Sequence, residues 1–227
     1  MSIANSIHTL LGTSPSDLIA YFEKGVFHVN PETDIKCLSF EKALEYSQAI
    51  HKRTIIGKSL GLFALDDAGD SNPYCYVTHG PCAGAVLHLH HDDASTIDFA
   101  SLDHFIAALT SLPDSAWIDE LKPEPSLVFA TQSELDRLLT ESDENKDVFS
   151  AIYLPVTRDI SNSLKASLVT NDDFFVREAF ANWLLQHGQS GDLQFAEQLS
   201  KDMFNQVASP ASAALNRIKL SGPPQLS

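Results

Sequence analysis

The sequence predicts an α+β domain, in which an antiparallel sheet packs with helices, followed by an all-α domain of helical hairpins. Residues 1–115 alternate between stretches of helical period and short apolar runs of strand length. Residues 116–227 contain almost no strand signal and are expected to be helical. Pro113, Pro123 and Pro125 punctuate the junction, so we place the domain boundary near residue 116.

Two helices are expected before the sheet. The run Ser14-Pro15-Ser16 offers an N-cap with proline just inside the helix, and apolar residues follow it at helical spacing. Ser39 is expected to cap a second helix, whose apolar stripe is interrupted by Ser47 and resumes at Ile50. Each helix therefore has an apolar face to turn toward a core.

The period of the sequence shortens after the second helix, which predicts strands. The strands are expected at residues 60–65, 74–78, 85–91 and 96–99. A run rich in Asp, Gly, Asn and Pro at 66–73 predicts the turn between the first two. Ser101 is then expected to cap an amphipathic helix. The predicted order is helix, helix, antiparallel meander, helix.

The helical half contains a weak internal repeat at an offset of 31 residues. The offset aligns Leu168 with Leu199, Val176 with Val207 and Leu184 with Leu215. Residues 171–179 and 213–218 resemble pieces of HEAT-like repeats, in which an Asp-containing turn precedes a helix that carries Val, Ala and Leu inward. Each copy is therefore expected to be a pair of helices.

The chain is strongly acidic, with 30 acidic and 15 basic residues and a formal net charge of −15. Nucleic-acid binding is not expected, because it depends on Lys and Arg displacing counterions from phosphates. A basic partner is favoured instead. Cys37, Cys75 and Cys82 lack the spacing of a zinc site or a disulfide framework, and we expect reduced thiols.

The expected location is the cytoplasm. No apolar run approaches the roughly 18 residues that a membrane span needs. Residues 1–12 lack the basic and apolar regions of a signal peptide. We therefore expect neither export nor membrane binding.

The most conspicuous chemical cluster is the run HLHHDD at 88–93. In a strand, His88 and His90 share one face about 6.6 Å apart along the chain, which suits two nitrogen ligands of zinc or iron. The simpler interpretation is a pair of histidines at a sheet edge beside a solvated turn. The sequence has no nucleophile elbow and no Gly-rich phosphate loop, so we expect neither catalysis nor a cofactor.

The residues best suited to bind a protein lie in and beside the turns of the meander. Two tyrosines share one strand face, and half-exposed tyrosines with solvated hydroxyls are common interface anchors. The acidic residues of the turns are expected to supply rim charges. The expected partner-binding residues are Asp66, Asp67, Asp70, Tyr74, Tyr76, Asp92 and Asp93.

Four runs of the first half together resemble the SUKH superfamily, which contains bacterial immunity proteins and fungal regulators of cell-wall glucan synthesis. The runs are LFALDDAGD at 62–70, YCYV at 74–77, GAVLHLHHDD at 84–93 and IDFASLDHFI at 97–106. They follow the pattern of three strands, with acidic turns, that lead into a Ser-capped helix. The resemblance covers residues 14–112.

The resemblance implies an α+β domain that works by binding. We therefore expect a cytosolic immunity protein that binds and neutralises a cognate secreted or contact-delivered bacterial toxin by occluding the toxin's catalytic domain. The acidity of the chain predicts a basic toxin. A non-enzymatic adaptor or regulatory scaffold is the alternative, and a metal-dependent enzyme that uses His88 and His90 is the second alternative.

Overall fold

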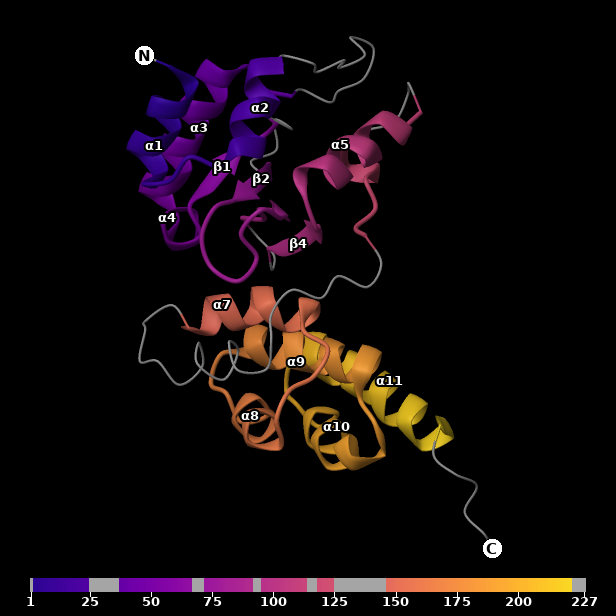
Figure 1. The fold of residues 1–227 in the computed structure, drawn as a ribbon. Coiled ribbons are helices and arrows are strands. Elements are labelled where there is room, and N and C mark those ends of the chain that lie inside the picture. The colour runs from indigo at the N-terminus through magenta and orange to yellow at the C-terminus, as the bar shows by residue number, and fades with distance from the viewer. Residues whose placement is uncertain are drawn as a thin grey trace, which may run out of the picture. The chain divides into compact units, whose positions relative to one another are not determined.

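The computed structural model describes residues 2–24, 37–66, 72–91, 95–113, 118–124 and 146–221, without the side chains of 119 and 146–149. The chain divides into two compact units, Met1–Leu127 (unit 1) and Val128–Ser227 (unit 2) (Figure 1). Among the described residues, no helix has the length and apolar character that crossing a membrane requires.

The division falls after Leu127 rather than near residue 116. The 3-10 helix η1 (Ile118–Glu120) and the residues after it belong to unit 1, where Ile118 and Leu121 are buried. The backbone N–H of Glu124 donates to the carbonyl of Asp98 at 2.8 Å. Two buried side chains and a backbone hydrogen bond therefore tie this proline-rich segment to the rest of unit 1.

The helices of unit 1 begin largely where the sequence predicts. They are α1 (Ile3–Leu11), α2 (Ser16–Lys24), α3 (Phe40–Arg53), α4 (Ile55–Ser59) and α5 (Leu102–Ser111). Ser39 caps α3 and Ser101 caps α5 through their side-chain oxygens, as expected. Two helices are not predicted from the sequence: α1, which Ser2 caps at its start, and the short α4.

The sheet of unit 1 is an antiparallel meander, which confirms the predicted fold class. Its strands are β1 (Leu62–Ala64), β2 (Tyr74–Val77), β3 (Val86–His88) and β4 (Thr96–Phe99), in the order β1-β2-β3-β4. The pairs Phe63 with Tyr76, Tyr76 with Val86 and Val86 with Phe99 place these four residues on one face.

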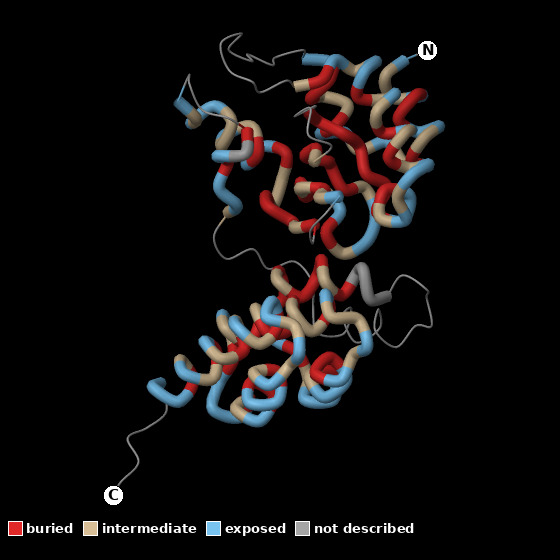
Figure 2. The backbone as a smooth tube through the Cα atoms, turned by 180° about the vertical axis from the view of Figure 1, so that it is seen from behind, coloured by how far each residue is buried: buried red, intermediate tan, exposed pale blue. Residues whose placement is uncertain are grey.

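Aromatic side chains join this face of the sheet to the helices. Phe63 contacts Phe22 of α2 and Phe40 of α3, with ring centroids 5.5 and 6.3 Å away. Phe105 of α5 packs against Phe99 at 5.5 Å. Figure 2 shows the strands buried while the outer sides of the helices are exposed. The sheet is thus the core of unit 1.

Helix α3 also covers the free edge of β1, which has only β2 as a neighbour in the sheet. The Ser47 hydroxyl accepts from the N–H of Ala64 at 2.8 Å and donates to the carbonyl of Ala43 at 2.6 Å. One turn later, His51 Nε2 lies 2.9 Å from the carbonyl oxygen of Leu62. The polar residue that interrupts the apolar stripe therefore satisfies backbone groups that an edge strand leaves unpaired.

Unit 2 is helical, as the sequence predicts. Its elements are α7 (Lys146–Tyr153), η2 (Leu154–Val156), α8 (Asn162–Leu168), α9 (Phe174–His187), η3 (Ser190–Asp192), α10 (Leu193–Leu199) and α11 (Asn205–Ser221). Helix α9 contacts both α7 and α11, while α8 packs on α9 and α10 packs on α11 (Figure 1).

The predicted offset of the internal repeat is confirmed by these bounds. Adding 31 to the first and last residue numbers of α8 gives those of α10. Adding 31 to the first residue number of α9 likewise gives that of α11. Leu168 and Leu199 are both buried, as are Val176 and Val207. The third aligned pair differs, because α11 buries Ala214 and Ile218 and leaves Leu215 half-buried.

Candidate binding site

Asp66 was expected to be a solvated rim charge, and that expectation is wrong. The residue is fully buried, and its Oδ1 accepts from the backbone N–H of Tyr74 at 2.6 Å. Beside this bond, the N–H of Leu65 donates to the carbonyl of Tyr74 at 2.9 Å. The carboxylate thus supplies the acceptor that continues the ladder between β1 and β2. The other expected acids, Asp67, Asp70, Asp92 and Asp93, lie outside the described residues.

The expectation of half-exposed tyrosines is also wrong, because helices cover both rings. Tyr74 stacks on His88 at a centroid distance of 4.2 Å and packs against Phe105 of α5 at 5.3 Å. Tyr76 donates its hydroxyl to the carboxylate of Asp17 on α2, at 2.8 and 2.9 Å from the two oxygens. Both side chains are core residues in this structure, so neither is available as an anchor.

His88 and His90 lie together, as the strand period predicts, with ring centroids 4.0 Å apart. His88 Nε2 lies 3.0 Å from the carbonyl oxygen of Asn72, which can only accept, so this nitrogen carries a proton. Its Nδ1 lies 3.7 Å from Oδ2 of the buried Asp98. Burial raises the pKa of Asp98, against the opposing effects of the Thr96 hydroxyl and His90.

His88 already has several partners within unit 1. Its Nε2 donates to the carbonyl of Asn72, and its ring stacks on Tyr74 and lies tilted against His90. In the part of the chain that the structure describes, no three His, Cys, Asp or Glu residues are grouped so that they could hold a metal. The geometry of this cluster is that of a packed polar network at the sheet.

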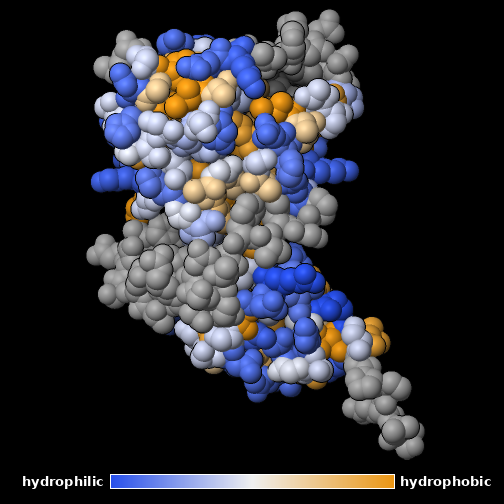
Figure 3. All heavy atoms as spheres, in the orientation of Figure 1, coloured by the Kyte–Doolittle hydropathy of each residue, from blue (hydrophilic) through white to orange (hydrophobic). Residues whose placement is uncertain are grey.

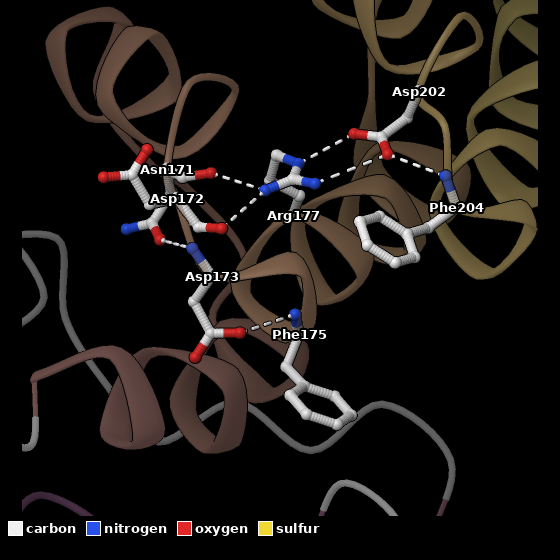
Figure 4. Close-up of polar contacts among 7 residues, drawn as sticks. All are labelled: Asn171, Asp172, Asp173, Phe175, Arg177, Asp202 and Phe204. Carbon is white, nitrogen blue, oxygen red and sulfur yellow. Dashed lines mark hydrogen bonds and ion pairs between the residues drawn. The ribbon is translucent and has the colours of Figure 1, made fainter.

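A polar cluster of unit 2 lies at the turns that precede α9 and α11 (Figure 4). The guanidinium of Arg177 donates to the carbonyls of Asn171 and Asp172 at 2.7 and 3.0 Å. Its Nε also donates to Asp202 Oδ2 at 2.7 Å, across to the next repeat. Arginine is suited to this bridge because its planar donors reach several oxygens at once.

The two turns repeat the same local bond. The N–H of Asp173 donates to the side-chain oxygen of Asn171 at 2.8 Å, and one repeat later the N–H of Phe204 donates to Asp202 Oδ1 at 3.0 Å. The hydrogen bonds from Arg177 and Phe204 hold the pKa of Asp202 below its usual value, because they favour its ionised form. Both turns are therefore held in fixed conformations.

Aromatic and apolar side chains surround these turns. Phe174 stacks on Phe204 with centroids 4.8 Å apart, which joins the two repeats. The neighbouring Phe175 is 41% exposed and Met203 is 86% exposed, although both are large and apolar. A groove of about 350 Å³ runs between the turns, with Asp172, Arg177 and Lys201 in its lining.

We call this region the repeat-turn surface, defined by Asn171–Asp173, Phe174, Phe175 and Asp202–Phe204. It combines exposed apolar side chains with the exposed carboxylate of Asp172 on a hydrogen-bonded frame. Interfaces use such a combination, in which apolar anchors supply affinity and rim charges select the partner. On the face drawn in Figure 3, by comparison, hydrophobic residues occur in small groups among hydrophilic ones.

The sequence pattern does not mark the repeat-turn surface as a site, although residues 171–179 resemble part of a HEAT-like repeat. Two consecutive phenylalanines at the start of a helix suggest core packing, and only the rotation of α9 decides that Phe175 faces solvent. An available signal was the repeat offset itself, which aligns Asn171 with Asp202 before each helix.

The SUKH and HEAT-like resemblances of the two halves rest on their sequence patterns. No protein-family model, no curated protein and no solved structure matches the chain.

Proposed function

We propose that this chain is a cytoplasmic immunity protein that binds a basic protein toxin and neutralises it by covering the toxin's catalytic domain. The observation that carries the proposal is the repeat-turn surface, on whose two turns Phe175, Met203 and Asp172 are exposed. The class of partner comes from the resemblance of residues 14–112 to the SUKH superfamily. Unit 2 is thus proposed to make the contact.

The chemistry of the surface supports a protein partner. Phe175 and Met203 can enter apolar pockets of a partner, and burying one such side chain is worth about 1.5–3 kcal/mol. Arg177 already holds the two turns together, so little conformational entropy is lost when a partner binds. A preformed surface of this kind suits an inhibitor that must act quickly.

The charge of the chain supports a basic partner. A net charge of −15 attracts a cationic protein over a distance of about 10 Å at moderate salt and raises the association rate by about 10- to 1,000-fold. The acidic residues Asp67, Asp70, Asp92 and Asp93 of unit 1 remain proposed partner-binding residues. Asp66, Tyr74 and Tyr76 are withdrawn from that set because they are buried.

The test is co-expression with the secreted protein encoded beside this gene, followed by co-purification and an assay of the toxin's activity. We expect a complex, loss of toxin activity, and an affinity that falls by about 10- to 100-fold in the double variant Phe175→Ser, Met203→Ser. The matched control is Leu220→Ser, because Leu220 is apolar and 87% exposed at the far end of α11.

Two results would contradict the proposal in different ways. If no neighbouring secreted protein binds, the immunity function fails. If a toxin binds equally well to the double variant and to Leu220→Ser, the function stands but the repeat-turn surface is not the interface. Binding to a resident cellular enzyme instead would favour the adaptor.

A further inference from the structure

An open pocket of about 530 Å³ lies in unit 1, away from the sheet face that the aromatic residues fill. It is formed by the end of α1, the last turns of α3, the end of α4 and the loop after β2. Its described lining residues are Leu10, Leu11, Gly12, Gln48, His51, Lys52, Lys58, Gly61 and His79. Its volume is in the range of small-molecule sites.

The lining is cationic although the chain is acidic. Lys52 and Lys58 supply two ammonium groups, and no carboxylate occurs among the described lining residues. Lys52 lies in the last turn of α3, where a cation also stabilises the helix dipole. Lys58 lies on α4, so the dipole of α3 does not explain its presence in the lining. His79 comes from the loop after β2, the strand next to β1 in the sheet.

The fold holds the floor of the pocket rigidly. Gly61 has a φ of +58°, and a Cβ on it would overlap both His79 Nδ1 and Thr78 Oγ1. The backbone N–H groups of Thr78 and His79 both donate to the carbonyl of Leu60, at 3.1 and 3.0 Å. A residue with a side chain at position 61 would therefore displace His79.

Hydrogen bonds also fix the proton on His79. The Thr78 hydroxyl donates its one proton to the carbonyl of Gly61 at 2.7 Å. It therefore has to accept from His79 Nδ1, which lies 2.8 Å away. Nε2 is left as the ring nitrogen of His79 that these two bonds do not use.

His51 has a different part in the pocket. Its Nε2 donates to the carbonyl of Leu62, so the ring is anchored on β1. Burial lowers the pKa of His51, and the nearby His79 and Lys58 lower it further, against the opposing effect of that hydrogen bond. The proposed anion site therefore depends on Lys52 and Lys58 rather than on His51.

We propose that this pocket binds a small organic phosphate. A phosphate monoester carries between about −1.5 and −2 charges at pH 7, which matches two ammonium groups better than a single carboxylate does. Leu10 and Leu11 provide an apolar wall for the organic part of the ligand, and the Gln48 amide offers a further donor. The binding is independent of the repeat-turn surface, whose residues lie in unit 2.

The test is calorimetric titration of the full chain with 1-naphthyl phosphate, and with 1-naphthol as the uncharged probe. We expect saturable binding of the phosphate, about tenfold weaker binding or more in Lys52→Gln and in Lys58→Gln, and little binding of 1-naphthol. The matched control is Lys42→Gln, which removes the same charge from an exposed position near the start of α3.

Several outcomes overturn the proposal. Equal binding of 1-naphthol and its phosphate would make the pocket merely apolar. Equal losses in Lys42→Gln and Lys58→Gln would mean that the ligand senses only the overall charge of the chain. The proposal would also be wrong if 1-naphthyl phosphate does not bind at millimolar concentration. Lys52 and Lys58 are exposed, so the variants are expected to fold, and far-ultraviolet circular dichroism checks that.

Discussion

The edge of β1 in unit 1 and the repeat turns of unit 2 satisfy their polar groups in different ways. In unit 1, the edge of β1 is completed by Ser47 and His51 of α3, and the ladder to β2 is extended by Asp66. Each of these contacts occurs once. In unit 2, the N–H of Asn171 donates to the carbonyl of Leu168, and one repeat later the N–H of Asp202 donates to that of Leu199.

This difference teaches where each unit is vulnerable. A contact that occurs once has no substitute, so its removal leaves a buried backbone group without a partner. A contact that recurs is local, and a neighbouring copy persists when one is removed. We therefore expect single substitutions to cost more stability at the edge of β1 than at the repeat turns.

The largest expected effect is that of Ser47→Ala. The substitution removes the acceptor of the buried Ala64 N–H, and it should lower the free energy of unfolding by about 1–3 kcal/mol. Urea unfolding measures the loss, and hydrogen exchange should locate it in β1 and α3. The control is Ser111→Ala, since the exposed Ser111 hydroxyl only donates to Ala108 within its own helix. A loss no greater than that of the control would contradict the account of the edge.

A smaller effect is expected from Arg177→Gln, which breaks the bridge between the repeats. Asn171 and Asp202 remain close to solvent and keep their own turn bonds, so we expect a loss of about 1–2 kcal/mol at pH 7. Because the pKa of Asp202 is lowered in the folded chain, its stabilising effect is present above the ordinary carboxylate range and lost as the pH falls through the lowered value.

The difference between wild type and Arg177→Gln should therefore shrink in acid. Urea unfolding at pH 7 and at pH 3 measures it. Lys201→Gln is the control, because Lys201 is exposed just after α10 and pairs with the exposed Glu197, four residues earlier, at 3.4 Å. A difference that persists unchanged in acid would show that Arg177 acts through the carbonyls of Asn171 and Asp172 or through its contact with Phe204, rather than through Asp202.

The same contrast explains what the sequence could predict. The caps at Ser39 and Ser101 and the offset of the repeat are local or periodic, so the sequence displays them. Asp66 begins a run of turn-forming residues and therefore resembles a solvated acid. Only the three-dimensional pairing of β1 and β2 reveals that Tyr74 needs its carboxylate.

The candidate sites follow the same rule. Phe175 is exposed because of how α9 is rotated in the packed unit, which helical period alone does not fix when apolar residues are adjacent. Met203 is exposed on the turn that precedes α11. The phosphate pocket gathers Leu11, Lys58 and His79 from separate elements. The net charge of the sequence is negative, so composition does not indicate the positive charge of this pocket.

The smallest expected effect compares one histidine from each unit. Burial lowers the pKa of His51 in unit 1 and of His187 in unit 2, so for both the unfolded chain binds protons more readily than the folded chain. Stability should therefore fall as the pH drops through about 6.5, and only modestly, because both histidines are partly exposed and solvent screens the effect.

His51→Gln should reduce that pH dependence in unit 1, and His187→Gln should reduce it in unit 2. Glutamine retains an N–H donor for the carbonyl of Leu62, so the first variant separates the titration of His51 from its hydrogen bond. Unfolding free energies at pH 5.5 and 7.5, with hydrogen exchange to assign each unit, provide the measurement. If His51→Gln is as pH-dependent as wild type while His187→Gln is not, the edge of β1 does not sense protons, and the two units differ in this respect as well.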